Sequence, residues 1–223
     1  MNLKYISEYG NRVDSFKLEI YQKGFTGDHQ EIEATCRIKT KEVDNAIESI
    51  RGTALNIDIV ANVNNSFDEF FIIPEREYKV KFYRNESQIF EGFIDPKGVR
   101  QPYVQRNWNI SLLATDQLAS LENFRFKYDN ELPNEFHFLY LALKKTGLDL
   151  PFAFFDSTNV RRFQNGNFQL QELKQFWQDT ERIIRPSVFV NDNGRFEDCQ
   201  TIVNDILKKY NFVLKQESII NKI

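Results

Sequence analysis

Apolar and polar residues alternate along most of the first half of the chain. The clearest run covers residues 31–38, where every second residue is apolar and the residues between them are charged or hydroxylic. Alternation with a period of two places successive side chains on opposite faces of a strand, so this run predicts a half-buried β-strand. The same pattern recurs in residues 17–21, 55–59, 78–82, 89–94 and 108–114.

Turn residues separate these runs, and no long helical pattern interrupts them. Gly24, Gly27 and Asp28 lie between the first two runs, and Arg84–Glu86 lies between residues 78–82 and 89–94. Short strands joined by polar turns favour an antiparallel β-barrel or sandwich, which we predict over residues 1–115. Its core is expected to contain the following apolar residues of the runs: Ile32, Ala34, Cys36, Ile38, Val80, Phe82, Trp108, Ile110 and Leu112.

The periodicity changes after residue 115. Thr115 or Asp116 can cap a short helix, because both side chains accept hydrogen bonds from free amides at a helix start. Pro133 precedes a longer helical pattern, and Gly147 supplies a left-handed stop after it. We therefore predict a mixed helical and irregular connecting region over residues 116–197.

The last segment, residues 198–223, begins with a strong helical signal. Apolar residues spaced three and four apart over residues 198–210 predict an amphipathic helix. Phe212–Leu214 then has the pattern of a strand, which either pairs backwards or belongs to a further domain. We expect the second. The predicted fold class is α+β, predominantly antiparallel β, with a helical linker that leads toward a second β domain.

Composition narrows the possible partners. The chain has 223 residues, of which 27% are charged, and its net charge is −3. Lys and Arg are interleaved with Asp and Glu, so no basic cluster is available to neutralise phosphates. The apolar runs are too short for a membrane-spanning helix, and the first residues lack the apolar stretch of a secretory signal. We expect neither nucleic-acid sequence recognition nor membrane insertion.

The residues that usually ligate metals are few. Cys36 and Cys199 occupy apolar positions of periodic patterns and are expected to be small buried hydrophobes without a disulfide, as in a reducing compartment. His29 lies in a polar turn and His137 on a predicted helix. Neither histidine has a second His or Cys at ligand spacing, so we expect no metal and no cofactor.

Catalytic patterns are also missing from the sequence. The acidic pairs Asp68–Glu69 and Glu75–Glu77 could each supply a glycosidase carboxylate, but charges that protect strand edges are the stronger explanation. No nucleophile elbow or triad spacing occurs. Residues 191–194 resemble the start of a calcium loop without its final glutamate, which favours a β-turn. We expect no enzymatic activity.

One stretch, Glu86–Asn123, has a more distinctive pattern. A strand with a glycine between aromatic residues is followed by proline-containing turns, a second strand and an Ala-Thr-Asp run. In this stretch the chain resembles the N-terminal barrel of phage baseplate hub and tail-tip proteins, and residues 198–215 resemble the linker helix of that family. The matching residues are Phe90, Gly92, Phe93, Asp95, Pro96, Pro102, Tyr103, Trp108, Ala114, Thr115 and Asp116.

The resemblance implies a structural component of a phage tail tip or baseplate hub, which joins the tail tube to the tip or spike. It also implies a homotrimer around the tail axis, partners among the neighbouring tail tube and tip proteins, and a location in the virion after synthesis in the host cytoplasm. Two alternatives stay open. The 21 phenylalanines are compatible with a carbohydrate-binding β-sandwich that attaches to a host surface, and the chain could also be an unrecognised hydrolase.

Overall fold

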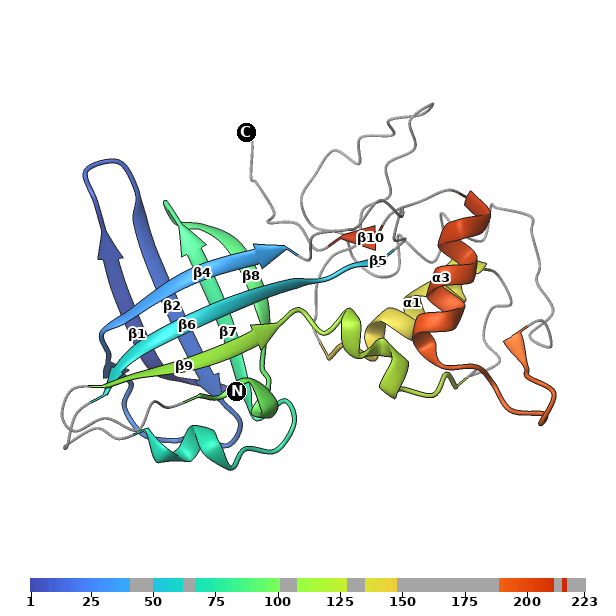
Figure 1. The fold of residues 1–223 in the computed structure, drawn as a ribbon, viewed down its shortest axis with the longest axis horizontal. Helices are drawn as coiled ribbons and strands as arrows, with labels where there is room; N and C mark the ends of the chain where they lie inside the picture. Colours follow the sequence, from blue (N-terminus) through green and yellow to red (C-terminus); the bar gives the residue numbers. More distant parts are fainter. Residues whose placement is uncertain are drawn as a thin grey trace. The chain divides into compact units, whose positions relative to one another are not determined.

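A computed structural model describes residues 1–40, 50–61, 67–100, 108–127, 135–147, 189–210 and 214–215. The chain divides into two compact units. The first contains Met1–Ala119 and Val213–Ile223, and the second contains Ser120–Phe212. The described strands of the large sheet belong to the first unit, and the helices α1 (Glu135–Lys144) and α3 (Cys199–Tyr210) belong to the second. Figure 1 labels these elements.

An eight-stranded, mostly antiparallel sheet with the order β3-β1-β2-β7-β8-β9-β6-β4 forms the first unit. Its strands are β1 (Asn2–Gly10), β2 (Ser15–Gln22), β3 (Gln30–Glu31), β4 (Ala34–Thr40), β6 (Thr53–Ala61), β7 (Tyr78–Arg84), β8 (Ser87–Ile94) and β9 (Trp108–Thr115). The prediction of a predominantly antiparallel β fold is confirmed, and each of the six alternating runs contributes a strand. The sheet is open, with β3 and β4 at its two margins.

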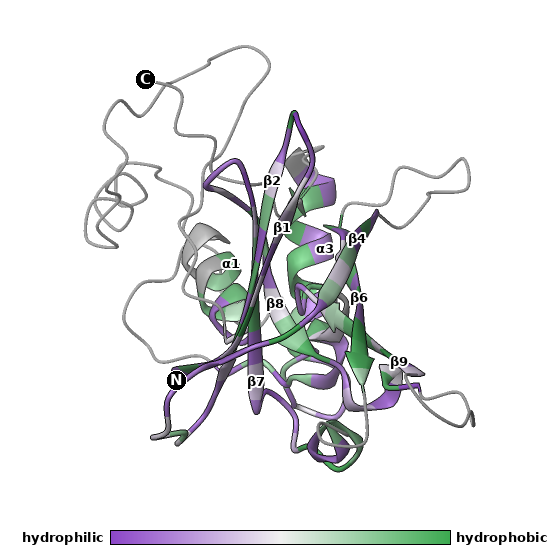
Figure 2. Ribbon diagram, turned by 90° about the vertical axis from the view of Figure 1, so that its left-hand side faces the viewer, coloured by the Kyte–Doolittle hydropathy of each residue, from purple (hydrophilic) through white to green (hydrophobic). Residues whose placement is uncertain are grey.

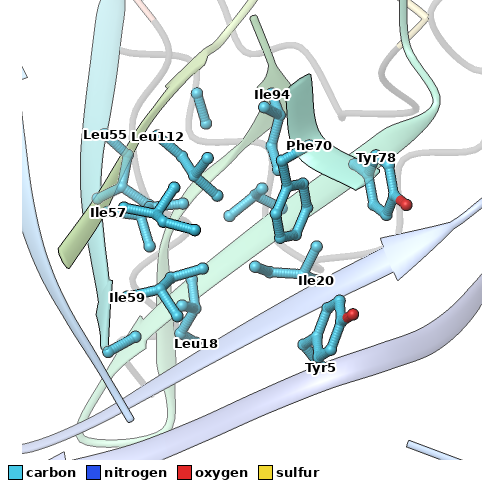
Figure 3. Packing of buried hydrophobic residues seen from close by; sticks show 14 of the residues in the cluster. Tyr5, Leu18, Ile20, Leu55, Ile57, Ile59, Phe70, Tyr78, Ile94 and Leu112 are labelled. Carbon is cyan, nitrogen blue, oxygen red and sulfur yellow. The ribbon is translucent and has the colours of Figure 1, made fainter. Parts of the chain in front are cut away.

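Side-chain alternation decides which face of each strand is buried. In β6, Leu55, Ile57 and Ile59 have no exposed surface, while the residues between them are half-buried. The alternation is visible as changes of colour along the strands in Figure 2. Figure 3 shows the aliphatic side chains of β2, β6 and β9 gathered in one cluster, with Tyr5, Phe70 and Tyr78 beside them. Each fully buried aliphatic side chain stabilises the fold by ~1.5–3 kcal/mol.

The sheet turns a corner between β8 and β9. These two strands pair over only two positions, Phe93 with Thr115 and Ile94 with Ala114. Beyond that corner β9, β6 and β4 run across β1, β2 and β7, as Figure 1 shows. Because both halves of the sheet contribute buried residues to one cluster, the core lies between the two halves.

The two marginal strands belong to one segment of chain, because only two residues separate β3 from β4. β3 pairs in parallel with β1, and the amide of Ile32 continues this contact by donating to the Ile6 oxygen at 2.8 Å. β4 pairs antiparallel with β6, and the Val60 amide donates to the Glu33 oxygen at 2.9 Å. Residues 30–40 therefore contact both halves of the sheet.

Burial differs from the prediction at one end of β4. Ala34, Val80, Phe82, Ile110 and Leu112 are buried as predicted. The prediction for Ile38 is wrong, since 41% of its surface is exposed. β1 ends at Gly10 after its side chains have reached the amides of Ala34 and Cys36, so no strand of the opposite half covers Ile38. Ile32, Cys36 and Trp108 are half-buried against the core.

The short helix predicted after residue 115 is a 3-10 helix instead, η3 (Ala119–Asn123). Gln117 has a φ of 66°, a left-handed conformation that prevents a regular helix from starting directly at Asp116. Two further 3-10 helices, η1 (Asp68–Phe71) and η2 (Pro96–Gly98), lie in the first unit.

In the second unit α1 (Glu135–Lys144) contacts α3 (Cys199–Tyr210), and both helices agree with the sequence prediction. Asp198 caps α3, where its carboxylate accepts the Thr201 amide at 2.8 Å. The predicted turn at residues 191–194 is confirmed by the bond from the Gly194 amide to the Asn191 oxygen. None of the helices in the described ranges is long and apolar enough to cross a membrane.

The strand predicted after α3 is β10 (Leu214–Lys215), which pairs in parallel with β5 (Ile50–Arg51). Both strands belong to the first unit, so the chain returns to that unit after α3. Of the two possibilities that the sequence left open for this strand, the described residues show pairing backwards.

Candidate functional site

The corner between β8 and β9 brings together several residues of the Glu86–Asn123 pattern. Gly92 lies against the end of β9, where a Cβ atom would be 2.3 Å from the Thr115 carbonyl oxygen and 2.7 Å from the ring of Phe90. Real Cβ atoms do not approach a backbone oxygen this closely. Glycine is therefore required by the approach of the two strands and not by an unusual φ.

After β8 the chain leaves the ladder and then returns to the same partner strand. The Asp95 amide still donates to the Leu113 oxygen at 2.8 Å, and the Asp95 carboxylate accepts the Lys97 amide at 2.9 Å. Pro96 starts η2, where its missing amide costs no hydrogen bond. Arg100 then pairs with Ser111, so η2 is an insertion between two contacts with β9.

Asp116 joins the end of β9 to the start of β6. Its carboxylate accepts the Thr53 amide at 2.5 Å and the Leu118 amide at 3.1 Å, and its own amide donates to the Thr53 oxygen at 3.1 Å. Only 1% of the residue is exposed, and burial raises the pKa of this carboxyl from 3.8 to about 6 against the opposing effect of the two amides. The predicted cap is thus an aspartate turn that also fastens a neighbouring strand.

Of the remaining residues of the pattern, some lie at this corner, and the others lie away from it or outside the described ranges. Phe93 and Ala114 belong to the corner itself, through the two paired positions of β8 and β9. Trp108 lies at the opposite end of β9, opposite Ala61. Pro102 and Tyr103 fall outside the described residues. The structure therefore gathers Gly92, Phe93, Asp95, Pro96, Ala114, Thr115 and Asp116, with the Phe90 ring in contact.

A second polar cluster, which the sequence did not single out, surrounds Glu19 on the outer face of β2 and β7. Its carboxylate accepts Tyr21 Oη at 2.6 Å and Tyr83 Oη at 3.0 Å, and Lys17 Nζ lies 2.8 Å away. Burial is the largest single influence on the pKa of Glu19 and acts to raise it. The hydrogen bonds from Lys17 and the two tyrosines outweigh it, so the pKa is lowered overall. Alternation predicts that Glu19 faces outward, but not that two tyrosines cover it.

The same outer face continues across β7 to β8. Glu91, of which 5% is exposed, forms an ion pair with Lys79 and accepts Gln88 Nε2 at 3.0 Å. Lys81 lies between the two acids, since in the strand register it is opposite Glu19 of β2 on one side and opposite Glu91 of β8 on the other. The outer face is thus a charge-balanced ladder, with its acidic groups satisfied within the chain.

A hollow of about 620 Å³ lies beside this cluster, at the tip of the β1–β2 hairpin. Four carboxylates and one lysine line it: Glu8, Asp14, Glu19, Glu86 and Lys17. Acid–base hydrolysis of a glycoside needs one carboxyl with a raised pKa beside an ionised one. The hydrogen bond from Arg84 lowers the pKa of Asp14, and that of Glu19 is also lowered. These two groups therefore lack the pair of pKa values that this chemistry requires.

One glutamate of each acidic pair noted in the sequence has a side-chain partner in the structure. Glu69 accepts Tyr5 Oη at 2.6 Å and Lys4 Nζ at 2.5 Å, which ties η1 to β1. Glu77 accepts Gln22 Nε2 at 3.3 Å. Within the described ranges no group of three His, Cys, Asp or Glu side chains could hold a metal ion. Cys36 and Cys199 are both free thiols.

Exposed aromatic rings, which a sugar-stacking surface would need, are scarce in the described part of the chain. Phe71 is 37% exposed, and every other aromatic side chain described there is buried or half-buried. Its neighbour Ile72 is 91% exposed and therefore the most prominent apolar side chain of that loop. A single phenylalanine beside an isoleucine does not form an aromatic platform.

Comparisons with known proteins add no family to this description: no protein-family model matches the chain, and no curated protein matches it.

Proposed function

We propose that this chain is a structural component of a phage tail tip or baseplate hub, which joins the tail tube to the tip or spike by oligomeric assembly. In this proposal the protein acts as a homotrimer around the tail axis and contacts neighbouring tube and tip proteins. It works in the virion, after synthesis in the host cytoplasm, without catalysis and without a cofactor.

The observation that supports this proposal most is the corner at Gly92. Seven of the eleven residues that give the sequence its resemblance to hub barrels come from two separate stretches, around Gly92–Pro96 and around Ala114–Asp116. They meet at a single point, where β8, β9 and β6 are fastened together. Residues that meet at one point of the fold support the resemblance better than the same residues would if they were scattered over the surface.

We also propose that the open sheet serves as a small barrel. Residues 30–40 connect its two margins, and side-chain oxygens strengthen the connection: Ser7 Oγ accepts the Ala34 amide at 3.2 Å and Tyr9 Oη accepts the Cys36 amide at 3.0 Å. A closed outline leaves few unpaired strand edges, which suits a module that stacks in a ring. The helices of the second unit would then form the linker, and a second β domain would follow β10, which returns to the first unit.

The direct test is the composition of assembled particles. Tails purified from a culture that produces this chain are fractionated, and the chain is quantified by mass spectrometry against the tail tube protein. We expect about three copies per tail, the number that a threefold ring requires. The proposal fails if the chain is absent from purified tails, or if it is recovered only as a free protein that binds sugars.

A further inference from the structure

The outward side of β4 has an ordered row of charges. Glu33, Thr35, Arg37 and Lys39 alternate with residues that face the core, and all four side chains are exposed. Glu33 precedes β4 by one residue but continues its ladder, because its carbonyl oxygen accepts the Val60 amide. Within the described ranges none of the three charged residues forms an ion pair or a side-chain hydrogen bond. Here β4 differs from the ladder on β2, β7 and β8, whose acids are paired.

The charges on the two sides of Thr35 are opposite in sign. The negative charge of Glu33 lies two residues before Thr35, and the positive charge of Arg37 lies two residues after it. The exposed residues Glu31 and Lys39 extend the same order outward. Suppose that a second copy of the strand lies face to face over the first and runs in the opposite direction, with the twofold axis crossing both strands at Thr35. Each carboxylate then lies opposite a cation. A parallel copy would place like charges opposite each other.

We propose that two copies of this chain pack the outer faces of β4 and β6 against each other about a twofold axis through Thr35. Each Glu33 then faces Arg37 of the second copy, and symmetry repeats the contact. A second copy of this chain fits the surface because, in the antiparallel arrangement, the charges of one β4 are complementary to those of the other. This inference does not rest on the proposed function: a threefold ring uses head-to-tail contacts between two different surfaces, whereas this contact joins the same surface of both copies.

The hydrogen bonds of β4 decide the geometry of the contact. The amides of Ala34 and Cys36 already donate to Ser7 Oγ and Tyr9 Oη, so the part of this edge that flanks Thr35 is not free to extend into a continuous sheet. The contact is therefore face to face, as in stacked sheets about 10 Å apart. The β6 residues on the same face, Ala54, Asn56, Asp58 and Val60, are short and half-buried, which allows this approach.

Asp58 gives the arrangement a second, independent consequence. It is the cross-strand neighbour of Thr35 and accepts Ser111 Oγ at 2.5 Å. Because Thr35 lies on the proposed axis, Asp58 also lies on it and meets the Asp58 of the second copy. Two like charges across an axis oppose association, so removal of this charge should strengthen the contact.

The test uses the whole chain and measures its mass by sedimentation over a range of concentrations. The unmodified protein should form a dimer that weakens at high salt. Glu33→Lys and Arg37→Glu each reverse two symmetric contacts, and each should raise the dissociation constant about tenfold. The double variant Glu33→Lys/Arg37→Glu exchanges the charges and should recover the original affinity, whereas Asp58→Asn should bind more tightly than the original.

Matched controls change the same kinds of charge elsewhere. Asp28→Lys and Arg12→Glu are exposed and have no ion pair within the described ranges, so both should leave the dissociation constant unchanged. Circular dichroism of every variant checks that the sheet is retained. A monomer at all concentrations overturns the inference, and so does a double variant as weak as the single ones. A trimer that Glu33→Lys does not affect also overturns it, while leaving the proposed ring intact.

Discussion

The carbonyl oxygen of Thr115 lies 2.3 Å from the point where Gly92 would have a Cβ atom, so these two residues define how closely β8 and β9 approach. We predict that Gly92→Ala costs ~3 kcal/mol of stability, because a methyl group there must push a backbone carbonyl out of its ladder. Urea denaturation measures the loss. Gly24→Ala is the matched control: Gly24 has a φ of 73° but open space around it, so that its cost should be only about 1 kcal/mol. Equal costs would contradict the close approach.

The raised pKa of the Asp116 carboxyl predicts that part of the protein's stability depends on pH. The folded state raises the pKa of its carboxyl from 3.8 to about 6, so the folded state binds the proton more tightly than the unfolded state. The resulting contribution is fully present below pH 3.8 and is lost as the pH rises to about 6, by about 3 kcal/mol over that interval. Asp116→Asn should remove this dependence, and the difference between the two pH profiles isolates it from other carboxyls. Parallel profiles would contradict the prediction.

Glu19 predicts a dependence of the opposite sign. Its pKa is lowered in the folded state, so its contribution is present above pH 4.5 and is lost as the pH falls below that value. At neutral pH, Glu19→Ala should cost ~2–3 kcal/mol, since it leaves two half-buried tyrosine hydroxyls without their acceptor. Tyr21→Phe and Tyr83→Phe each remove only one donor and should cost about 1 kcal/mol. Thermal denaturation of the three variants checks this order.

Matched substitutions on neighbouring strands test the burial pattern. Ile57→Ala should cost ~3–4 kcal/mol, because its side chain has no exposed surface and the substitution leaves a cavity in the core. Ile38→Ala removes the same atoms from a side chain that is 41% exposed, and should cost less than about 1 kcal/mol. Chemical denaturation of both variants gives the comparison, and similar losses would mean that Ile38 is covered after all.

The two cysteines should be slow to react in the folded protein. Burial raises the pKa of Cys36 to about 12 and that of Cys199 to about 11, so little thiolate is present at neutral pH. Labelling by a thiol reagent, followed by mass spectrometry, should be slow without denaturant and rapid in urea for both residues. Rapid labelling of either one in the native protein would show that its thiol is accessible.

Local patterns account for most of the strands. Alternation over residues 31–38 and 108–114 predicts β4 and β9, because the residues that determine which face of a strand is buried are neighbours in the sequence. Residues 2–10 also alternate, with Leu3, Tyr5 and Tyr9, but the many polar residues among them weaken the pattern, so that it does not predict β1. The exposure of Ile38 could not be predicted, because it depends on where β1 ends in another half of the sheet.

The candidate site depends still more on distant contacts. Asp116 was predicted as a cap from its position after a strand, but its contact with Thr53 joins residues 63 positions apart in the chain. The burial of Glu19 likewise arises from Tyr83, which is 64 positions away. A carboxylate on an alternating strand looks the same in the sequence whether solvent or two tyrosines surround it.

The single segment that forms both β3 and β4 has a consequence for the misfolding of this protein. A transient opening of residues 30–40 breaks the bonds to Ser7 and Tyr9 and bares the margins of both halves of the sheet together. Two unprotected margins on one molecule allow it to pair with a neighbour on each side, which is the requirement for growth of a fibril. The fold thus concentrates its aggregation hazard in one short local opening, instead of distributing it over two separate strands.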